Sequence, residues 1–493
     1  MFGWPRCHSA TALPDAPKKI LKIRTSTPFR DCVSAVHGVV FKFCESAGRA
    51  RPSKGGAMAP PLHPLFFELQ AQDPLIKPTS RLASRELRRN TGRMQSSDAE
   101  APVESKWRIL ALLFTARCVM GMQFESVGAL GPLLRAEGLD YARLGILVGA
   151  YLAPSVLVAL PGGIMVQRLG ERTTLLLCAA LMFAGAVVDL SSDWNARLLA
   201  RIIAGTGGVV FTIAGTKMIA DLFTGRQFGL AMAALAGSWP CGIALALIAL
   251  PPIADKFGLM GASMALVILT LMALILLFAL PKQARPSAPL SAAFPGATVT
   301  AAVAIAGLVG GTANATFANA FAFGPLLLTE RGYTAEIAAS HVSVALWVTI
   351  AAIPVGGALA IRRGSGIWIA AASLLLAAVG MAAVPVSDHD VLIFAALGLV
   401  AGLSGATFAS LPTWALPAQA RAVGMGIFFS AFYAGMLALP PIAGVFAHRA
   451  GGAGVAFDVA AVALLIAMPL LGAFAALVST PRSASAAVEE GAA

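Results

Sequence analysis

The chain has 493 residues, of which 58% are hydrophobic and 12% are charged, and its mean hydropathy is +0.79. These values exclude an ordinary soluble domain, in which about a quarter of the residues are charged. About twelve apolar runs reach the roughly 20 residues that a membrane-spanning helix needs. The composition therefore predicts an all-α polytopic membrane protein.

Residues 1–105 differ from the rest of the chain. They carry 16 of the 36 basic and 9 of the 24 acidic residues, a net charge of +7 out of +12. The segment is rich in Pro, Ser and Arg without a clear period, which predicts disorder. It is either a basic arm for nucleic acid or anionic lipid, or a leader preceding a true start near Met94. We favour the second interpretation, and so expect no nucleic-acid partner.

The predicted spans form two sets of six, in residues 106–281 and 298–478, with a hinge loop at 282–297 and a tail at 479–493. The first set is 107–131, 143–165, 173–190, 196–218, 227–250 and 258–280. The second set is 298–327, 336–360, 366–386, 391–415, 421–443 and 455–478. Twelve Lys and Arg residues lie beside the span ends on the side of the N-terminus and six on the other side. The positive-inside rule therefore predicts both termini in the cytoplasm.

The two sets are related by an internal repeat. Gly131-Pro-Leu-Leu returns as Gly324-Pro-Leu-Leu, 193 residues later, and Pro161 returns as Pro354 at the same offset. The run Leu-Pro-Pro-Ile-Ala also occurs twice, beginning at Leu250 and at Leu439. A period this long is too great for a solenoid and indicates duplication of a whole half of the molecule.

Two motifs carry a family resemblance. The loop after the second span runs Gly163-Ile-Met-Val-Gln167-Arg168-Leu-Gly170-Glu171-Arg172, with a weaker copy at Gly357 to Gly364 that includes Arg362. The fourth span holds Arg201-x-x-x-Gly205-x-Gly207. Both resemble motifs of the major facilitator superfamily.

The resemblance implies a monomer with twelve transmembrane helices in two pseudo-symmetric six-helix bundles, working as a secondary transporter in the inner or plasma membrane. The motif residues expected to act in gating are Gly163, Arg168, Gly170, Arg172, Arg362 and Gly364. Gln167 stands where the family has an Asp that latches the two halves, so this loop lacks the carboxylate of that latch. Gly131-Pro-Leu-Leu and Lys217-Met-Ile-Ala-Asp221-Leu-Phe further resemble bacterial cyanate permeases and related anion porters.

Ionisable residues inside spans are functional candidates because they are costly there. Arg117 follows Trp107 by ten residues, roughly 15 Å along the helix, which places it near the middle of a ~30 Å core. A guanidinium there suits an anionic substrate. The alternative is an arginine that binds helix-end carbonyls. Glu125 shares a helix face with Arg117 and is a candidate proton carrier, or else a structural partner of Arg201.

Further candidates complete the predicted site. Arg201 is expected to face the substrate by family analogy, although a purely structural role is open. His341 is a second proton-coupling candidate, or a solvated histidine at a helix end. The remaining predicted substrate contacts are Gln123, Asn314 and Asn319, of which the two asparagines could instead join helices.

Several chemistries have no sequence support. The six cysteines have no metal-ligand spacing, and no phosphate-binding GxxxxGK[ST] loop or HExxH pattern is present. We therefore expect neither an enzyme nor a cofactor. The predicted function is proton-coupled uptake of a small anion by alternating access. Proton-driven efflux of drugs or metabolites, and a non-transporting receptor on the same fold, are the alternatives.

Overall fold

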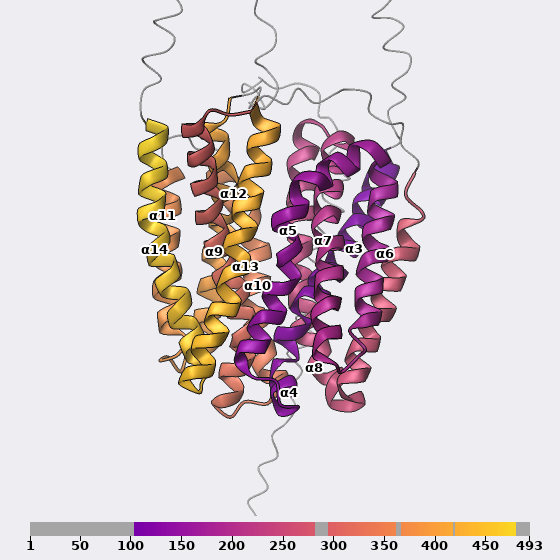
Figure 1. Ribbon diagram of the computed structural model, residues 1–493, viewed down its shortest axis with the longest axis vertical. Helices are drawn as coiled ribbons and strands as arrows, with labels where there is room; N and C mark the ends of the chain where they lie inside the picture. The colour runs from indigo at the N-terminus through magenta and orange to yellow at the C-terminus, as the bar shows by residue number, and fades with distance from the viewer. Residues whose placement is uncertain (1–102, 282–293, 361–365, 418–419, 480–493) are drawn as a thin grey trace, which may run out of the picture. The chain divides into compact units, whose positions relative to one another are not determined.

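The computed structural model describes residues 103–281, 294–360, 366–417 and 420–479 (Figure 1). All of them belong to one compact unit. The predicted leader, except for its last three residues, most of the hinge loop 282–297 and the tail after Ser479 lie outside the described residues.

Within the described residues all regular secondary structure is helical, as predicted. The N-terminal half contains α3 (Val103–Ala129), α4 (Gly131–Ala136), α5 (Tyr141–Leu169), α6 (Glu171–Val188), α7 (Trp194–Leu222) and α8 (Gly225–Leu277). The C-terminal half contains α9 (Ala297–Glu330), α10 (Ala335–Ala360), α11 (Gly366–Ala383), α12 (Asp390–Ala415), α13 (Arg421–Ala450) and α14 (Gly454–Ser479).

Helix α8, 53 residues long, consists of two helices joined at a kink, and it contains two of the predicted spans. The first of these two spans was expected to end at Leu250, but the helix continues through Pro251 and Pro252. The direction of the chain changes instead at Gly258, where φ is 71° and ψ is 176°. This backbone conformation is essentially restricted to glycine. The two spans were predicted at 227–250 and 258–280. The break lies at Gly258, where the second was predicted to begin, but the first helix continues past its predicted end at Leu250.

Eleven described helices are long and apolar enough to cross a membrane. Since α8 contributes two spans, the described part of the chain contains twelve, six in each half. The predicted polytopic all-α fold is thus confirmed. The apolar length of the helices explains their stability in a bilayer, where every backbone N–H and C=O must find a partner within its own helix.

Helices α3 and α9 contact each other, α5 packs against α13, and α8 packs against α10. We call the end of the helices at which α4 lies the α4 end; it is the lower end in Figure 1. Glycines allow the helices to approach closely there. A Cβ added to Gly128 of α3 would lie 2.8 Å from Cα of Ala322 in α9. Lipid provides no hydrophobic driving force between helices, so the close packing that such small residues allow holds the helices together.

Candidate functional site

Arg117 lies where the exposure of α3 changes. Every residue from Cys118 to the end of α3 is buried, whereas several residues before it are partly exposed. Helix α9 shows the same pattern, since residues 318–328 are all buried. The two halves are therefore closely packed at the α4 end and less closely packed toward the opposite end. Arg117 is the deepest partly exposed position of α3.

The guanidinium of Arg117 is only partly engaged. Its Nη1 donates to the carbonyl oxygen of Leu235 in α8 at 3.0 Å, while its Nε is buried without a hydrogen-bond partner. The guanidinium lies within electrostatic range of the Tyr433 hydroxyl on α13. Arg117 thus belongs to one half of the molecule and lies near Tyr433 of the other half, and its Nε has no hydrogen-bond partner.

Aromatic rings surround Tyr433. The ring of Phe429 is stacked on the Tyr433 ring, with centroids 6.3 Å apart and planes inclined by 29°. Phe432 meets Tyr433 edge to face at 5.5 Å. Phe429 is 39% exposed although it lies one helical turn from Tyr433 on the same face of α13. The surface beside Arg117 is therefore aromatic.

Arg201 is only 2% exposed and is enclosed by the N-terminal half. Its Nε donates to the carbonyl oxygen of Leu147 at 3.2 Å, and its Nη atoms donate to the carbonyls of Gln123 and Phe124 and to the Ser126 hydroxyl. The guanidinium carbon also lies 5.0 Å from the ring centre of Tyr151. This geometry favours the structural alternative, since most of its N–H groups already have partners.

Glu125 is 2% exposed, and its Oε1 atom has no hydrogen-bond partner. It is within electrostatic range of Arg201, but no ion pair within 4.0 Å joins these two described residues. The added Cβ of Gly128 that would approach α9 would also lie 2.1 Å from Glu125 Oε1. The carboxyl group therefore lies at the contact between the two halves, where the charged form is costly.

The remaining predicted substrate contacts differ in whether their side chains donate hydrogen bonds to another helix. Gln123 donates to the Met182 carbonyl of α6 at 2.9 Å, within the N-terminal half. Asn319 is fully buried and donates to the Ala456 carbonyl of α14 at 2.8 Å, which is the interhelical contact left open by the sequence. Asn314 bonds only within its own helix, to the Gly310 carbonyl at 3.0 Å. Of these three, Asn314 alone is partly exposed.

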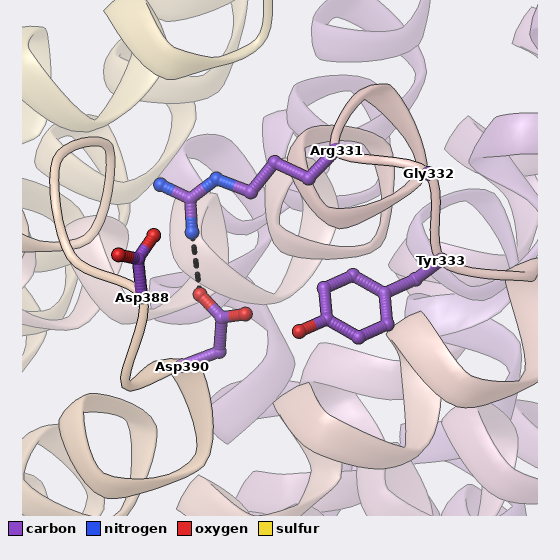
Figure 2. Close-up of a pocket in the computed structure, with 5 residues that line it drawn as sticks. All are labelled: Arg331, Gly332, Tyr333, Asp388 and Asp390. Atoms are coloured by element: carbon purple, nitrogen blue, oxygen red, sulfur yellow. Dashed lines mark hydrogen bonds and ion pairs between the residues drawn. The ribbon is translucent and has the colours of Figure 1, made fainter.

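His341 lies at the α4 end, in the second turn of α10, whereas Arg117 lies in the middle of α3. Its ring packs edge to face on Tyr333 with centroids 5.2 Å apart, and its Nδ1 is buried without a partner. It lines a cavity of about 470 Å³ together with Asp388, His389 and Asp390. Figure 2 shows residues that line an adjoining cavity of about 410 Å³, where the guanidinium of Arg331 points toward the Asp390 carboxylate. The Arg331 guanidinium and the Asp390 carboxylate are 2.5 Å apart, so these two charges already pair with each other.

The loop after α5 follows the predicted motif only in part. Gly170 has a φ of 80°, which lets α5 end and α6 begin within one residue. Arg168 is exposed, and Arg172 donates to the Phe278 carbonyl just beyond α8 at 2.9 Å. Gly163 lies within α5. Arg362 and Gly364 lie outside the described residues.

Sequence analysis missed a charged network at this loop. Lys217 of α7 donates to Glu171 and, at 2.7 Å, to Asp221. Glu171 occupies the place where the motif usually has a basic residue, so the structure explains that departure: the carboxylate is the partner of Lys217. The network joins α6 to α7 within the N-terminal half and does not reach the other half.

Asp189, just after α6, was also missed. Burial raises the pKa of its carboxyl group, while the charges of Arg201 and Arg197 act in the opposite direction. Its position one residue beyond an apolar span gave no signal of this, because the nearby arginines come from α7. Among the described residues, no group of three or more His, Cys, Asp or Glu side chains could hold a metal ion.

The model of the Major Facilitator Superfamily matches residues 113–416, more than half of the chain. The chain belongs to this superfamily. The match explains both sequence motifs and the two six-helix halves, and it identifies a transporter fold in which Arg117, Glu125 and Arg201 all lie on helices of the N-terminal half.

Two curated relatives of this superfamily member are similar over part of their length. The 4-hydroxybenzoate transporter PcaK of Pseudomonas aeruginosa is 27% identical over 190 residues, 36% of this chain and 41% of PcaK. The inner membrane transport protein YajR of Escherichia coli is 27% identical over 125 residues, 25% of this chain and 27% of YajR. The chain thus spans less than half the length of either relative. Both are transport proteins by name.

Proposed function

We propose that this superfamily member is a secondary transporter that carries a small organic anion together with protons into the cell. The observation that supports this most is Arg117. A guanidinium with a buried, unpartnered Nε sits at the limit of the exposed part of α3 and interacts with the other half of the molecule. An unpartnered buried donor is costly unless a ligand satisfies it.

The chemistry beside Arg117 favours an anion that carries an apolar ring. Arginine binds carboxylates through two parallel hydrogen bonds, and aromatic rings bind other rings edge to face or offset. Tyr433 and Phe429 supply such rings. The name of PcaK, a 4-hydroxybenzoate transporter, agrees with this chemistry, since that compound joins a carboxylate to an aromatic ring. The inorganic anions of the cyanate-permease resemblance have less support.

Glu125 is the proposed proton carrier. Its Oε1 atom is buried without a partner at the contact between α3 and α9, so it is better accommodated there as the neutral acid. When the halves separate at this contact, water can reach the carboxyl group and the proton can leave. His341, at the α4 end, is the proposed second proton-coupling residue.

The proposed orientation follows from the distribution of Lys and Arg. With both termini in the cytoplasm, the α4 end faces the outside and the less closely packed end faces the cytoplasm. Arg117 is then accessible from the cytoplasm, as expected after release of the substrate. The protein is proposed to act as a monomer.

Proton flux into proteoliposomes of the purified protein tests the function. Benzoate, acetate and cyanate would be supplied in turn, and a pH-sensitive dye inside the vesicles would report protons. We expect flux with benzoate, a loss of at least tenfold in Arg117→Gln, and partial retention in Arg117→Lys, which keeps the charge but lacks the planar fork. Normal flux in Arg117→Gln would remove the anion site from this position.

The unpartnered carboxylate of Glu125 favours one other function, proton-driven efflux of lipophilic cations. In that case the same vesicles would release protons when they are given a lipophilic cation such as tetraphenylphosphonium, and Glu125→Gln would abolish the release while Arg117→Gln would not. The positive charge of Arg117 beside the aromatic surface weighs against this function, because it repels cations.

A further inference from the structure

The two halves meet at the α4 end along a seam between α5 and α13. A Cβ added to Gly145 would lie 2.2 Å from the Pro440 carbonyl oxygen, and one added to Gly149 would lie 2.8 Å from Cγ of Pro441. A Cβ added to Gly444 would lie 2.5 Å from the Tyr141 carbonyl oxygen. Glycine is required at these three positions for the helices to approach so closely.

A hydrogen bond between side chains closes the end of this seam. The Tyr141 hydroxyl, on the first residue of α5, donates to Oε1 of Glu330, on the last residue of α9. Both carboxylate oxygens of Glu330 also accept from the backbone N–H of Ala453, at 3.0 and 3.1 Å. Glu330 therefore joins the N-terminal half to the turn between α13 and α14.

The contacts around this bond hold the Tyr141 side chain in place. The Arg135 guanidinium carbon lies 3.9 Å from the centre of the Tyr141 ring, and Arg135 also donates to the Leu139 carbonyl. Tyr141 is only 5% exposed, whereas Glu330 is exposed. A solvent-exposed carboxylate can return to water when the bond breaks, so the interaction is reversible.

Two ion pairs at the same end behave differently. Arg331 pairs with Asp390 at 2.5 Å, and Arg197 pairs with Glu137 at 3.7 Å. Each of these pairs stays within one half and can persist when the halves separate. The Tyr141–Glu330 bond cannot persist, because its two side chains belong to different halves.

We propose that Tyr141 and Glu330 form a latch that holds the two halves together at the α4 end and must break each time this end opens. The Gly145–Gly149–Gly444 seam behind it is the surface that parts. The latch lies at the opposite end of α5 from Gln167, which stands where the family has its latching Asp. It concerns the conformational equilibrium alone and does not depend on which substrate is carried.

Labelling of a buried cysteine tests the latch. Val148 is 3% exposed and lies three residues after Gly145 on the face of α5 that meets α13. In full-length protein whose six native cysteines are replaced by serine, Val148→Cys would react with a polar maleimide only when the seam opens. Reaction rates would be compared with and without the latch, in the absence of any substrate.

We expect Tyr141→Phe and Glu330→Gln each to label roughly five- to tenfold faster than the parent, from the loss or weakening of a hydrogen bond to a charged group. Asp390→Asn is the matched control, because it removes an ion pair at the same end but within one half, and its rate should equal that of the parent. Tyr141→Phe removes a single oxygen atom and keeps the ring, so it tests the latch with the smaller structural change of the two variants. Unchanged rates in Tyr141→Phe, or an equal increase in Asp390→Asn, would overturn the latch. Since no substrate is present, failure of the transport assay would leave this result intact.

Discussion

Two arginines lie deep within spans of the N-terminal half, and their surroundings give them different roles. Arg201 donates to carbonyl oxygens of α3 and α5 and is closed off from solvent. Arg117 donates to one carbonyl oxygen and keeps an unpartnered Nε. A guanidinium whose donors are satisfied by backbone stabilises the fold, whereas one with a free donor can bind a ligand.

This difference predicts that Arg201→Ala lowers stability far more than Arg117→Ala. Removal of Arg201 leaves the carbonyl oxygens of Leu147, Gln123 and Phe124 buried without that partner, at a cost of about 3 kcal/mol or more. Arg117→Ala should leave the unfolding temperature nearly unchanged while abolishing transport. Thermal unfolding in detergent, followed by tryptophan fluorescence, measures the unfolding temperature of both variants. Equal unfolding temperatures for the two variants would contradict the assignment.

The sequence identified both arginines but could not separate their roles. A charge inside an apolar run is visible in the sequence, yet its partners depend on how neighbouring helices are rotated about their axes. The partners of Arg201 are backbone carbonyls, which leave no trace in side-chain identity. Tyr141 and Glu330 were missed for a related reason: they lie 189 residues apart, at span ends where polar residues are ordinary.

At the scale of single helices, α7 explains why Arg201 and Gly205 occur together. A Cβ on Gly205 would lie 1.8 Å from the Tyr151 carbonyl oxygen, so α7 can approach α5 closely only with glycine at this position. That approach brings Arg201 within reach of the Leu147 carbonyl, one turn earlier on α5. The Arg201-x-x-x-Gly205 motif thus allows close packing of α7 on α5, in which Arg201 is buried.

Gly205→Ala should therefore disrupt the packing of α5 on α7. We expect a loss of roughly 2 kcal/mol or more in stability, as for an overpacked core, and a lower yield of folded protein on gel filtration. Gly215→Ala on the same helix is the control, since nothing lies within 4 Å of the added Cβ. That variant should be neutral or slightly stabilised, because alanine is the better helix former. A stable Gly205→Ala protein would show that the helices can separate at no cost.

The break within α8 gives a second prediction at this scale. Gly258 has a φ of 71° and a ψ of 176°, which costs a residue with a Cβ about 1–3 kcal/mol. Gly258→Ala should lower the unfolding temperature, whereas Gly296→Ala, with a φ of −59° and open space around it, should not. Identical melting curves for these two variants would mean that the turn can adopt another conformation.

The lengths of the spans were predictable, because a bilayer fixes them. Ten of the twelve predicted spans agree with separate helices to within a few residues at most ends. The prolines misled the assignment at two places. Pro251 and Pro252 lie inside α8, and Pro440 and Pro441 lie inside α13, which continues to Ala450. In a bundle of membrane helices, neighbouring helices satisfy the carbonyls that a proline frees, so proline ends a helix less often than in water.

At the scale of the whole molecule, the repeated halves meet through their repeated segments. A Cβ on Gly131 would lie 3.3 Å from Cγ of Leu326, so the two copies of Gly-Pro-Leu-Leu pack against each other. Burial is nevertheless unequal between the two ends of α3 and α9. Tight packing at one end and looser packing at the other are what the proposed alternating access requires of one of its two states.

Widening the seam should shift the molecule toward the other state. In Gly145→Ala the new Cβ would lie 2.2 Å from the Pro440 carbonyl oxygen, a backbone atom that moves only if α13 moves away from α5. Because this contact exists only when the α4 end is closed, the substitution destabilises the closed state and leaves the open state unaffected.

Spin labels on the exposed residues Glu137 and Glu336, one in each half, would report the separation of the α4 end by pulsed electron paramagnetic resonance. We expect the distance distribution of Gly145→Ala to move to longer values, and that of Gly405→Ala, which has nothing within 4 Å of its added Cβ, to match the parent. Gly149→Ala should give a smaller shift, because its Cβ would lie 2.8 Å from Cγ of Pro441 and 3.0 Å from the Leu437 carbonyl oxygen, both longer than the 2.2 Å contact of Gly145→Ala. An unchanged distribution in Gly145→Ala would mean that the glycine seam is not the surface that parts.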